Sequence, residues 1–486
     1  MNATPVEHVR TLILGAGFGG LGIGAQFARR GDRDFLILER SAGIGGVWRE
    51  NSYPGAACDT EAHLYCYSFF PHLRVSRMYA GRAELLDYLQ SMTEAFSLQP
   101  HIRFDSEVLA ARWDGAAKLW RLEVGGGKRY TAQFFVTAWG QLNKPSVPAF
   151  EGLDRFHGKM FHSAEWDHSV ELKGKRVASV GNAASAVQYV PEIAPLVAHL
   201  TVFQRSPNWI MPRNQVLFTP ELLEAFEVDP RLFDESRKRL HDFREAGFQR
   251  TRVGTADQAE GMRIAKEHLE KHVPDPDLRA KLTPDYEFAC KRILRSDDYF
   301  PALCRDNVTL ETRRIAGLYE DGIVTEDGAK HPFDVVIFGT GFASQAFHGD
   351  LVVEGLGGQT LSHAWRDGAE AYLGITVPNF PNLFMIYGPN TNLNHNSIIT
   401  MLEIQQNYII TAIEEVSALR GAISARVPVF EAFNGKLQAD MSNSAFSSGC
   451  SSWYKNSEGK VINNWSGTVD QYRAVTQWRP ADFDWF

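Results

Sequence analysis

The sequence predicts an α/β protein with two Rossmann-like dinucleotide-binding domains, the second inserted in the first, and a further helical insertion. Three observations predict this fold class. A glycine-rich turn follows an apolar strand near the N-terminus, a second such turn follows an apolar strand near residue 180, and a charged stretch at 213–285 has helical spacing. With 486 residues, the chain is long enough for two or three domains, each with its own core.

The first glycine-rich turn lies between a strand predicted at 9–14 and a predicted helix. It contains Gly15, Gly17 and Gly20 in the order G-x-G-x-x-G, and the next predicted strand ends on Glu39. Gly15 permits the tight turn, Gly17 lets the backbone approach a pyrophosphate, and Gly20 lets the helix pack closely on the strand. The helix N-terminus supplies N–H donors, and Glu39 can accept hydrogen bonds from ribose hydroxyls. The pattern therefore predicts a dinucleotide site.

Three segments elsewhere in the chain indicate which dinucleotide this is. Gly46 and Trp48 belong to a stretch that resembles the G-G-x-W segment of FAD-binding monooxygenases. Residues 333–342, a predicted buried strand and a turn containing Gly341, resemble the second FAD-side signature of two-dinucleotide flavoproteins. Residues 380–389 resemble the strand and turn that close the FAD domain in the same group. These resemblances imply that the N-terminal site binds FAD.

The second turn follows a strand predicted at 175–180 and contains Gly181, Ala183 and Ala186 where G-x-G-x-x-G/A is expected. Ala183 replaces the middle glycine, and its methyl group stands where the backbone must approach a pyrophosphate. This predicts weakened or shifted cofactor binding. The next predicted strand is followed by Arg205 instead of an acid, which favours a 2′-phosphate and so predicts NADP rather than NAD. A plain surface arginine is the alternative.

The stretch between the two turns fits the pattern F-x-G-x-x-x-H-x-x-x-W-[P/D] at each specified position. Its residues are Phe156, Gly158, His162, Trp166 and Asp167. The pattern is the fingerprint of type I Baeyer–Villiger monooxygenases, a branch of the flavin-containing monooxygenase superfamily, and the sequence resembles that family along nearly its whole length. The resemblance implies that these residues couple cofactor binding to domain movement and take no part in the oxygen transfer.

Two further segments resemble the catalytic parts of the same family. Residues 53–59 look like its Y-P-G-A-x-C-D motif, with Ala57 where arginine is commoner, and residues 290–292 match the segment whose arginine lies over the flavin. The resemblance implies that Arg292 is the catalytic cation and that Asp59 is its carboxylate partner, also within the cofactor site. A simple interdomain salt bridge is the alternative for this pair.

The reaction that the resemblance implies consumes NADPH and dioxygen. NADPH reduces FAD, the reduced flavin adds dioxygen at its C(4a) carbon, and the resulting peroxide attacks a ketone to give an ester or lactone. A peroxide anion needs a fixed cation in a water-poor site, and an arginine keeps its charge at any working pH. The resemblance also assigns Lys291, and Arg205 with Ser206, to the 2′-phosphate of NADP.

Two other functions remain open for the same sequence. A flavin monooxygenase that oxygenates nitrogen or sulfur uses the same peroxide in its protonated form, but Arg292 and the fingerprint that ends on Asp167 favour ketone oxidation. A flavoprotein oxidase or binding protein with impaired NADPH use is supported only by Ala183. A disulfide reductase is excluded because the chain has no redox dithiol motif.

Composition and spacing exclude several partners and cofactors. A net charge of -8 and a pI near 6.0 argue against nucleic acid. The N-terminal segment lacks the pattern of a secretory signal and no span-like apolar run is present, so a cytoplasmic protein without a membrane partner is expected. The five cysteines never form C-x-x-C, which predicts reduced, buried thiols and no disulfide framework. No histidine is expected to pair with a carboxylate at metal-ligand spacing on a helix, so no metal site is predicted.

The order of the motifs predicts the domain boundaries. Residues 1–145 and 330–486 are expected to form the FAD domain. Residues 146–212 and 286–329 are expected to form the NADP domain, inserted between the two parts. Residues 213–285 are expected to form a helical subdomain near the active site, because apolar residues recur there at helical spacing between prolines. A long loop is the alternative for this stretch.

Overall fold

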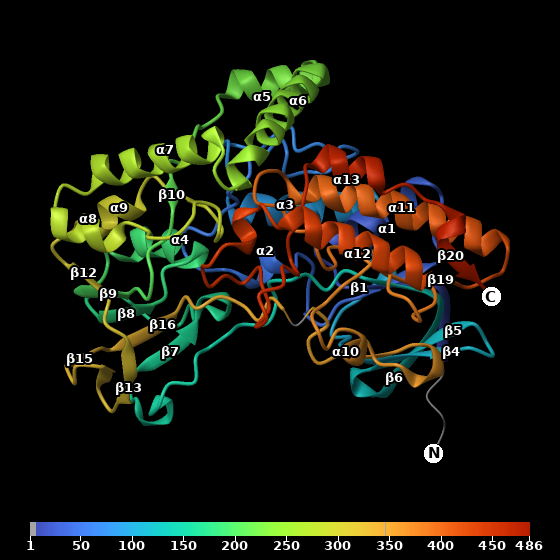
Figure 1. Ribbon diagram of the computed structural model, residues 1–486, viewed down its shortest axis with the longest axis horizontal. Helices are drawn as coiled ribbons and strands as arrows, with labels where there is room; N and C mark the ends of the chain where they lie inside the picture. Colours follow the sequence, from blue (N-terminus) through green and yellow to red (C-terminus); the bar gives the residue numbers. More distant parts are fainter. Residues whose placement is uncertain (1–5, 346) are drawn as a thin grey trace.

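Two sheets with parallel strands lie side by side in the protein (Figure 1). This computed structural model describes residues 6–345 and 347–486. Residues 1–5, the start of the N-terminal segment without a secretory-signal pattern, lie outside the described residues. Both sheets are covered by helices, and the predicted α/β class with two Rossmann-like folds is confirmed.

The first sheet is built by the N-terminal part of the chain and completed by its C-terminal part. Its strand order is β17-β4-β5-β6-β1-β2-β3, and β18 also pairs with β6. The strands are β1 (Val6–Leu14), β2 (Phe35–Leu38), β3 (Ile102–Arg103), β4 (Val108–Asp114), β5 (Leu119–Val124), β6 (Lys128–Thr137), β17 (Val352–Glu354) and β18 (Leu383–Met385). β1 is parallel to β2 and β6, whereas β4, β5 and β6 form an antiparallel meander. The strand expected within 380–389 therefore belongs to this sheet, because β18 is parallel to β6.

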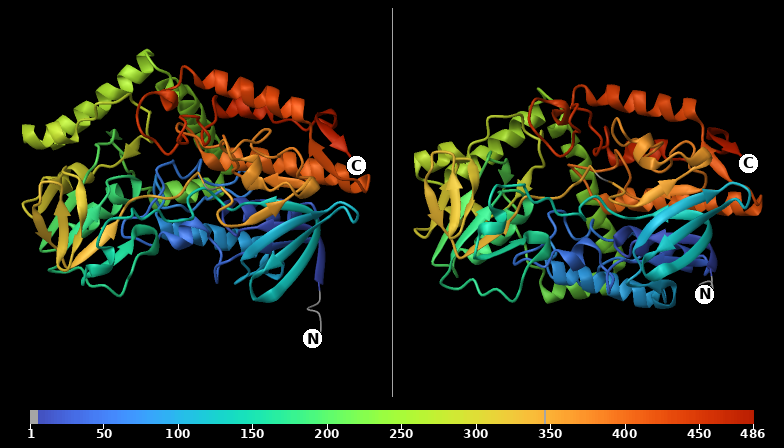
Figure 2. Two further views of the ribbon diagram at one scale, coloured as in Figure 1. Left: turned by 60° about the horizontal axis from the view of Figure 1, so that its bottom comes forward. Right: turned by 90° about the horizontal axis from the view of Figure 1, so that it is seen from below.

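Helix α1 (Phe18–Arg29) is buried along nearly its whole length, since it lies between this sheet and other helices. It packs against α11 (Ile398–Ala418) and α3 (Arg82–Ala95). Figure 2 shows α11 and α12 (Val427–Met441) above the first sheet in both of its views. The other α-helices and strands of this half are α2 (Val47–Glu50), α10 (Leu361–Ala364), α13 (Val469–Val475), β19 (Ile423–Ala425) and β20 (Phe483–Trp485).

The second sheet is fully parallel and has the strand order β12-β9-β8-β16-β7. Its strands are β7 (Lys159–His162), β8 (Arg176–Val180), β9 (His199–Phe203), β12 (Val308–Glu311) and β16 (Val335–Phe338). α4 (Ala184–Ile193) and α9 (Tyr299–Leu303) share an apolar core with it, in which Tyr189 and Tyr299 are among the largest buried side chains. A small antiparallel sheet of β13 (Ile315–Tyr319), β14 (Gly322–Thr325) and β15 (Lys330–Pro332) adjoins it.

Strand β16 was expected in the first sheet but lies in the second. β16, in the segment that resembles an FAD-side signature, pairs in parallel with β7 and β8 of the second sheet. The expectation that this strand belongs to the first fold is therefore wrong, whereas β17 and β18 further along the chain do join the first sheet. All four residues of β16 are buried, and a buried apolar strand has the same pattern in either sheet. The chain leaves the second sheet only after Phe338.

The charged stretch at 213–285 is helical, which excludes the alternative of a long loop. It contains α5 (Pro220–Val228), α6 (Pro230–Ala246), α7 (Ala256–His272) and α8 (Pro276–Leu282), and β10 (Ile210–Met211) and β11 (Leu294–Arg295) pair at its base. Pro230 and Pro276 begin helices, in accord with the breaks in the apolar pattern. α5 and α6 project at the top of Figure 1. Phe226 and Phe233 pack on the ring of His63, but Phe243 remains 57% exposed.

Two of the five cysteines are bonded to each other. Cys290 and Cys450, which are 160 residues apart, form a disulfide with their Cα atoms 6.2 Å apart. The prediction of reduced thiols is therefore wrong for this pair, because spacing along the chain does not reveal which distant segments meet. Cys58 and Cys66 are buried free thiols as predicted, whereas Cys304 is free and exposed.

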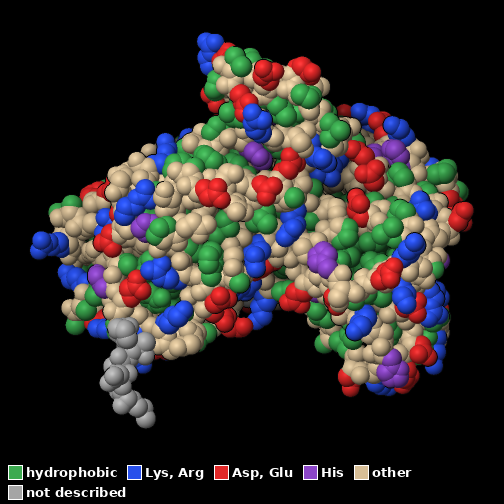
Figure 3. Space-filling view, turned by 180° about the vertical axis from the view of Figure 1, so that it is seen from behind, with side chains coloured by type: hydrophobic (Ala, Val, Ile, Leu, Met, Phe, Trp, Pro, Cys, Tyr) green, Lys and Arg blue, Asp and Glu red, His purple; other side chains and the backbone are tan. Residues whose placement is uncertain are grey.

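The face of the molecule shown in Figure 3 carries charges of both signs. On the face shown in Figure 3, acidic and basic side chains are intermingled, and this face is hollowed between two lobes at its lower edge. Within residues 6–345 and 347–486, no helix has the length and apolar character needed to cross a membrane.

Candidate active site

A cavity of about 1260 Å³ connects the glycine turns of the two folds. The predicted site residues on its wall are Gly15, Gly17, Glu39, Gly46, Trp48, Asp59, Gly181, Ala183, Arg205, Ser206, Lys291, Arg292 and Gly341. Gly20 and Ala186 are buried in helices beneath the two turns and do not line it. The two folds thus present their turns to one common space.

The turn of the first fold is shaped by the absence of side chains. Gly15 has φ +97°, and a Cβ atom there would lie 2.7 Å from the carbonyl oxygen of Ala138. A Cβ at Gly20 would lie 1.8 Å from the carbonyl oxygen of Gly15, so strand, turn and helix leave no room for a methyl group. Gly17 is the N-cap residue of α1 and has no side chain to cap it. A Cβ on the facing Gly46 would lie 3.1 Å from the Cα of Gly17. The turn therefore presents backbone N–H groups with no side chains in the way, which suits the binding of a pyrophosphate.

Glu39 holds this turn in place from the end of β2. Its side chain accepts hydrogen bonds from the backbone nitrogens of Ala16 (2.7 Å) and Ser41 (2.8 Å), and the residue is only 6% exposed. α1 has no side-chain cap and no acidic residue in its first turn, so its N–H groups remain available to an anion. Glu39 lies on the cavity wall where it can also accept from a ribose hydroxyl.

The turn of the second fold has the same backbone as the first. Gly181 has φ +101°, and a Cβ there would lie 2.5 Å from the carbonyl oxygen of Gly339. Ala183 caps α4 with φ −82° and ψ −165°, close to the φ −87° and ψ −167° of Gly17. Because any residue adopts this extended conformation, Ala183 causes no backbone strain. Its methyl group only narrows the approach of a phosphate.

A pocket of positive charge lies beside this second turn. Lys291 Nζ donates to Ser206 Oγ over 2.7 Å and lies 4.4 Å from the centre of the Tyr286 ring. Arg205 is exposed on the same cavity wall. Burial and the nearby charge of Arg205 together lower the pKa of Lys291, and Asp285 opposes this only in part. Two cations that repel each other in this way fit a doubly charged phosphate group, whose binding would relieve the repulsion.

Arg292 and Asp59 form a bidentate ion pair on the cavity wall. Arg292 Nη2 lies 2.7 Å from both Asp59 carboxylate oxygens, and Nε lies 3.2 Å from Oδ2. The two side chains are 33% and 24% exposed. The charge of Asp59 raises the pKa of Arg292 although burial opposes this. Burial alone would raise the pKa of Asp59, but the charge and hydrogen bonds of Arg292 outweigh it, so that pKa lies below its ordinary value. The site holds a permanent, oriented cation.

A further ion pair, more deeply buried, supports the first and is not predicted from the sequence. Arg244 on α6 binds Glu61 with Nη2 and Oε2 2.7 Å apart, and both side chains are at most 10% exposed. Arg244 also donates to the backbone oxygen of Asp59 over 3.4 Å. Tyr387, another unpredicted wall residue, donates to Asn392 Oδ1 over 2.8 Å, and burial raises its pKa to about 12. The only sequence signal for Arg244 was its place in the predicted helical insertion.

The five fingerprint residues lie outside the cavity wall, in the approach to the second sheet. Gly158 precedes β7, and a Cβ there would lie 2.6 Å from the carbonyl oxygen of Asp334, so the position requires glycine. Phe156 is buried, and the Trp166 ring lies 5.4 Å from that of Tyr189 on α4. Asp167 accepts from both the backbone nitrogen and the hydroxyl of Ser169, which lowers its pKa. Each of these residues stabilises the start of the second fold.

His162 ends β7 and is 2% exposed. Its Nδ1 accepts from the backbone nitrogen of Ala164 over 3.1 Å, and its ring lies 5.9 Å from that of Phe342. Burial lowers the pKa of His162, so its neutral form is favoured. The contact with Phe342 places this histidine next to Gly341, in the segment that returns from the second sheet toward the first.

One group of side chains has the spacing of metal ligands. His241 and Glu245 are four residues apart on α6, and the ligand atoms of these residues and Asp470 all lie within 4.8 Å of one another. The expectation that no histidine pairs with a carboxylate on a helix is therefore wrong. Glu245, however, accepts from Asn396 Nδ2 (2.7 Å), His395 Nε2 (3.2 Å) and the backbone nitrogen of Asp470 (3.1 Å). Both of its oxygens are engaged, and we assign the group to anchoring α13 on α6.

Comparison with known proteins identifies the family. Residues 8–221 match the family model described as flavin-binding monooxygenase-like. A Baeyer–Villiger monooxygenase of Streptomyces coelicolor is 40% identical over 474 residues, which is 97% of this chain and 91% of that protein. This chain belongs to the Baeyer–Villiger monooxygenases. It is a flavin-dependent monooxygenase enzyme, in accord with the prediction from the fingerprint.

Further relatives extend this assignment to both cofactors of a Baeyer–Villiger monooxygenase. An FAD-binding monooxygenase of Aspergillus niger is 37% identical over 493 residues, covering 97% of this chain and 81% of that protein. A solved structure of an oxidized steroid monooxygenase bound to NADP has a TM-score of 0.87 and 30% identity, covering 96% of this chain and 97% of that one. The predictions of FAD and NADP(H) as cofactors are confirmed.

Proposed function

We propose that the enzyme uses NADPH and dioxygen to convert a ketone into an ester or lactone, and that Arg292 and Asp59 are its catalytic pair. The observation that carries this proposal is the bidentate contact of Arg292 with Asp59 on the wall of the cavity shared by both glycine turns. When bound, FAD would supply the redox chemistry of the site, namely acceptance of a hydride from NADPH and reaction with dioxygen. The organic substrate and dioxygen are then the partners of the reaction, which we place in the cytoplasm because it draws on NADPH.

The first fold would hold FAD mainly through its backbone. Gly15 and Gly17 leave space for the pyrophosphate at the N-terminus of α1, and Gly46 faces them from the opposite side. Glu39 would bind a ribose hydroxyl, and Trp48 contributes an apolar wall to the same part of the cavity. These positions supply shape and N–H donors without a charged side chain at the turn itself.

The second fold would hold NADP through side-chain charge. Gly181 and Ala183 present the N-terminus of α4 to the pyrophosphate, as Gly15 and Gly17 do in the first fold. Lys291, Arg205 and Ser206 would bind the 2′-phosphate. Its negative charge would remove the repulsion between the two cations and raise the lowered pKa of Lys291.

Arg292 would stabilise negative charge that develops next to the ketone. Its guanidinium is positioned before the reaction starts, because Asp59 binds its Nε and Nη2 and Arg244 in turn binds the backbone of Asp59. Asp59 does not neutralise the site: Glu61 balances the charge of Arg244, but Arg295 adds a further positive charge nearby. The site would therefore favour an anion over a neutral group.

We propose a domain division close to the predicted one. Residues 1–145 and the C-terminal part form the FAD domain, and the segment from 146 to about Phe338 forms the NADP domain, with 213–285 as its helical subdomain. The return point follows β16 because that strand belongs to the second sheet. The fingerprint residues lie where the chain enters the NADP domain, and His162 touches Phe342 where it leaves. This supports a role in coupling the two domains.

The test compares variants of the catalytic pair on a panel of ketones and thioethers under steady NADPH. Arg292→Met should lower ester formation by about 10²–10³-fold, because one preorganised charged donor is lost from a water-poor site. Arg176→Met is the matched control, since Arg176 forms a similar ion pair with Asp334 away from the cavity. It should leave the rate of ester formation unchanged.

The outcomes separate the competing functions. Sulfoxide without any ester from the unmodified enzyme would overturn ketone oxidation and favour heteroatom oxygenation. Flavin that stays oxidised on anaerobic mixing with NADPH would overturn the NADPH-dependent reaction as a whole. Ester formation by Arg292→Met at the rate of the unmodified enzyme would remove Arg292 from the catalytic role.

A further inference from the structure

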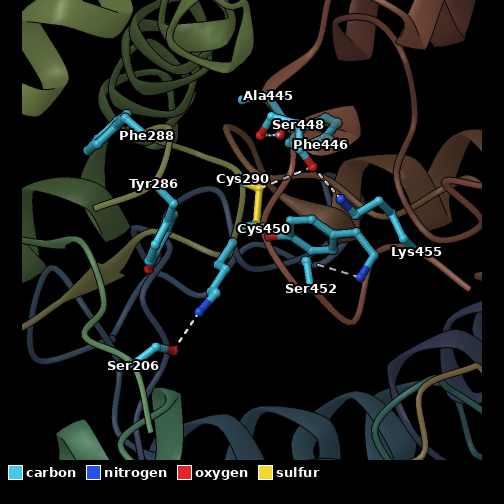
Figure 4. Close-up of a disulfide and its surroundings, with 12 residues drawn as sticks. Ser206, Tyr286, Phe288, Cys290, Ala445, Phe446, Ser448, Cys450, Ser452 and Lys455 are labelled. Atoms are coloured by element: carbon cyan, nitrogen blue, oxygen red, sulfur yellow. Dashed lines mark hydrogen bonds between the residues drawn. A yellow bond between two sulfur atoms is a disulfide. The ribbon is translucent and has the colours of Figure 1, made fainter. Parts of the chain in front are cut away.

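The Cys290–Cys450 disulfide joins two segments of the cavity wall that come from different parts of the fold (Figure 4). Cys290 lies between α8 and β11, immediately before Lys291 and Arg292. Cys450 lies near the C-terminal end of the chain, immediately before Ser451, Ser452 and Trp453, which line the same cavity. Neither sulfur atom has a part in the proposed reaction.

The segment around Cys450 has few other attachments. Residues 449–453 form neither helix nor strand, and Gly449 and Ser451 are exposed. Among the described residues, no hydrogen bond joins 449–453 to any residue outside 445–455. The nearby contact of Lys455 with the backbone oxygen of Ser448, drawn in Figure 4, is internal to that stretch. Trp453 packs on the apolar cluster of the C-terminal part, so residues 449–452 are held to another segment mainly by the disulfide.

The segment around Cys290, by contrast, is fixed and carries the cations of the site. Cys290 itself is fully buried. Lys291, the next residue, binds Ser206, and Arg292 binds Asp59. The disulfide thus connects a weakly held segment to the fixed groups that would bind NADP. Cys450 is half-buried and Cys290 fully buried, so a reagent in solution would approach the bond from the side of Cys450.

We propose that the disulfide is a reversible clasp. In the oxidised form it holds 449–453 against the NADP side of the cavity and slows the release of NADP(H), and in the reduced form it frees this segment. The clasp rests on the proposed function, because it regulates the retention of the cofactor which that function requires. A cytoplasmic location supports reversibility, since disulfides there are mostly transient or redox-sensing.

The chemistry needs one oxidant and one reductant. Hydrogen peroxide is the oxidant, and it takes two electrons and two protons from the thiols of Cys290 and Cys450. Its O–O bond breaks to give two water molecules, and the S–S bond forms. A small dithiol reverses this step. One of its thiolates attacks the Cys450 sulfur, the Cys290 thiolate leaves beside Lys291 and Arg292, and the second thiol of the reagent releases Cys450 as its own disulfide forms.

The experiment measures NADP⁺ binding to the FAD-containing enzyme in two redox states. One sample is treated with hydrogen peroxide and the other with a dithiol, and alkylation followed by mass spectrometry counts the free thiols in each. Titration calorimetry should give an NADP⁺ dissociation constant about tenfold higher in the reduced sample. Reduction lowers the fraction of molecules whose segment is closed, and the apparent affinity is proportional to that fraction. FAD content should be equal in both samples.

Two variants keep the test decisive. Cys450→Ser should bind NADP⁺ as the reduced enzyme does and should no longer respond to the dithiol. Cys304→Ser, which removes an exposed free thiol, should respond like the unmodified enzyme. Equal dissociation constants in the two redox states, or free thiols at Cys290 and Cys450 after peroxide treatment, would overturn the clasp. If NADPH reduced the flavin in neither redox state, the proposed function would be contradicted. The NADP⁺ dissociation constants would still test the clasp, because binding is measured without flavin reduction.

Discussion

The glycine turns of the two folds share a backbone but differ in sequence. At the first position both have glycine with φ near +100°, namely Gly15 and Gly181, and both lie under a carbonyl oxygen of the neighbouring strand's end. At the second position, Gly17 and Ala183 have almost the same φ and ψ. Only the first position therefore requires glycine for its conformation, because φ near +100° is unfavourable for residues with a Cβ.

At the third position of the motif, the packing of the helix on its turn explains why one fold has glycine and the other has alanine. A Cβ at Gly20 would lie 1.8 Å from the carbonyl oxygen of Gly15, whereas Ala186 carries its methyl group in a fully buried place. α1 therefore approaches its own turn more closely than α4 does. The first fold is built around tight backbone packing, while the second has room for two methyl groups and adds the charges of Lys291 and Arg205.

The largest expected effect comes from exchanging the third position. Gly20→Ala should destabilise the enzyme by about 3 kcal/mol, since a methyl group has no space beside backbone atoms that cannot move independently. Thermal unfolding and the ratio of FAD to protein measure this. Ala186→Gly is the matched change in the second fold and should cost only about 1 kcal/mol. A Gly20→Ala variant with unchanged FAD content and melting temperature would remove the difference between the folds.

A smaller effect is expected from the charge that only the second fold uses. Lys291→Met should raise the KM for NADPH about 30-fold, which corresponds to the loss of one hydrogen bond to a charged group, about 2 kcal/mol. Steady-state kinetics with NADPH and NADH measure this, and the KM for NADH should stay nearly constant. Equal losses for both cofactors would show that Lys291 does not bind the 2′-phosphate.

The same lysine predicts a pH dependence. Burial and Arg205 lower the pKa of Lys291, so its charge is lost as the pH rises through a value below 10.5, the ordinary pKa of a lysine. The KM for NADPH should therefore be constant at lower pH and rise on the alkaline side. Lys291→Arg keeps its charge and should remove this rise. An unchanged alkaline rise in that variant would assign it to another group.

The smallest effects are expected at the second position, where the two folds can be exchanged directly. Gly17→Ala creates no internal clash, since its Cβ would lie 3.6 Å from the Gly46 Cα, so only the approach of the phosphate is affected. It should weaken FAD binding by about tenfold, or 1.4 kcal/mol. Ala183→Gly should strengthen NADP⁺ binding by a few-fold at most. Both are measured by titration, and a larger gain from Ala183→Gly would show that its methyl group obstructs the cofactor.

Much of the site could be predicted because its parts are local. The strand, turn and helix around Gly15 and around Gly181 need only the residues within each turn. Arg292 and Asp59 were paired through the family resemblance, and they do meet. The Arg244–Glu61 pair had no such guide, since two charged residues 183 positions apart carry no pattern that links them.

The sequence by itself determined the two nucleotide-binding turns, the helical insertion and the family, because hydrophobic period, glycine positions and a fingerprint act over short stretches. Only the tertiary structure decided that β16 joins the second sheet, that Cys290 meets Cys450, and that His241 and Glu245 meet Asp470. These are contacts between segments far apart along the chain. They depend on how the folded elements pack, and a buried strand or a single cysteine has the same local pattern whichever partner it finds.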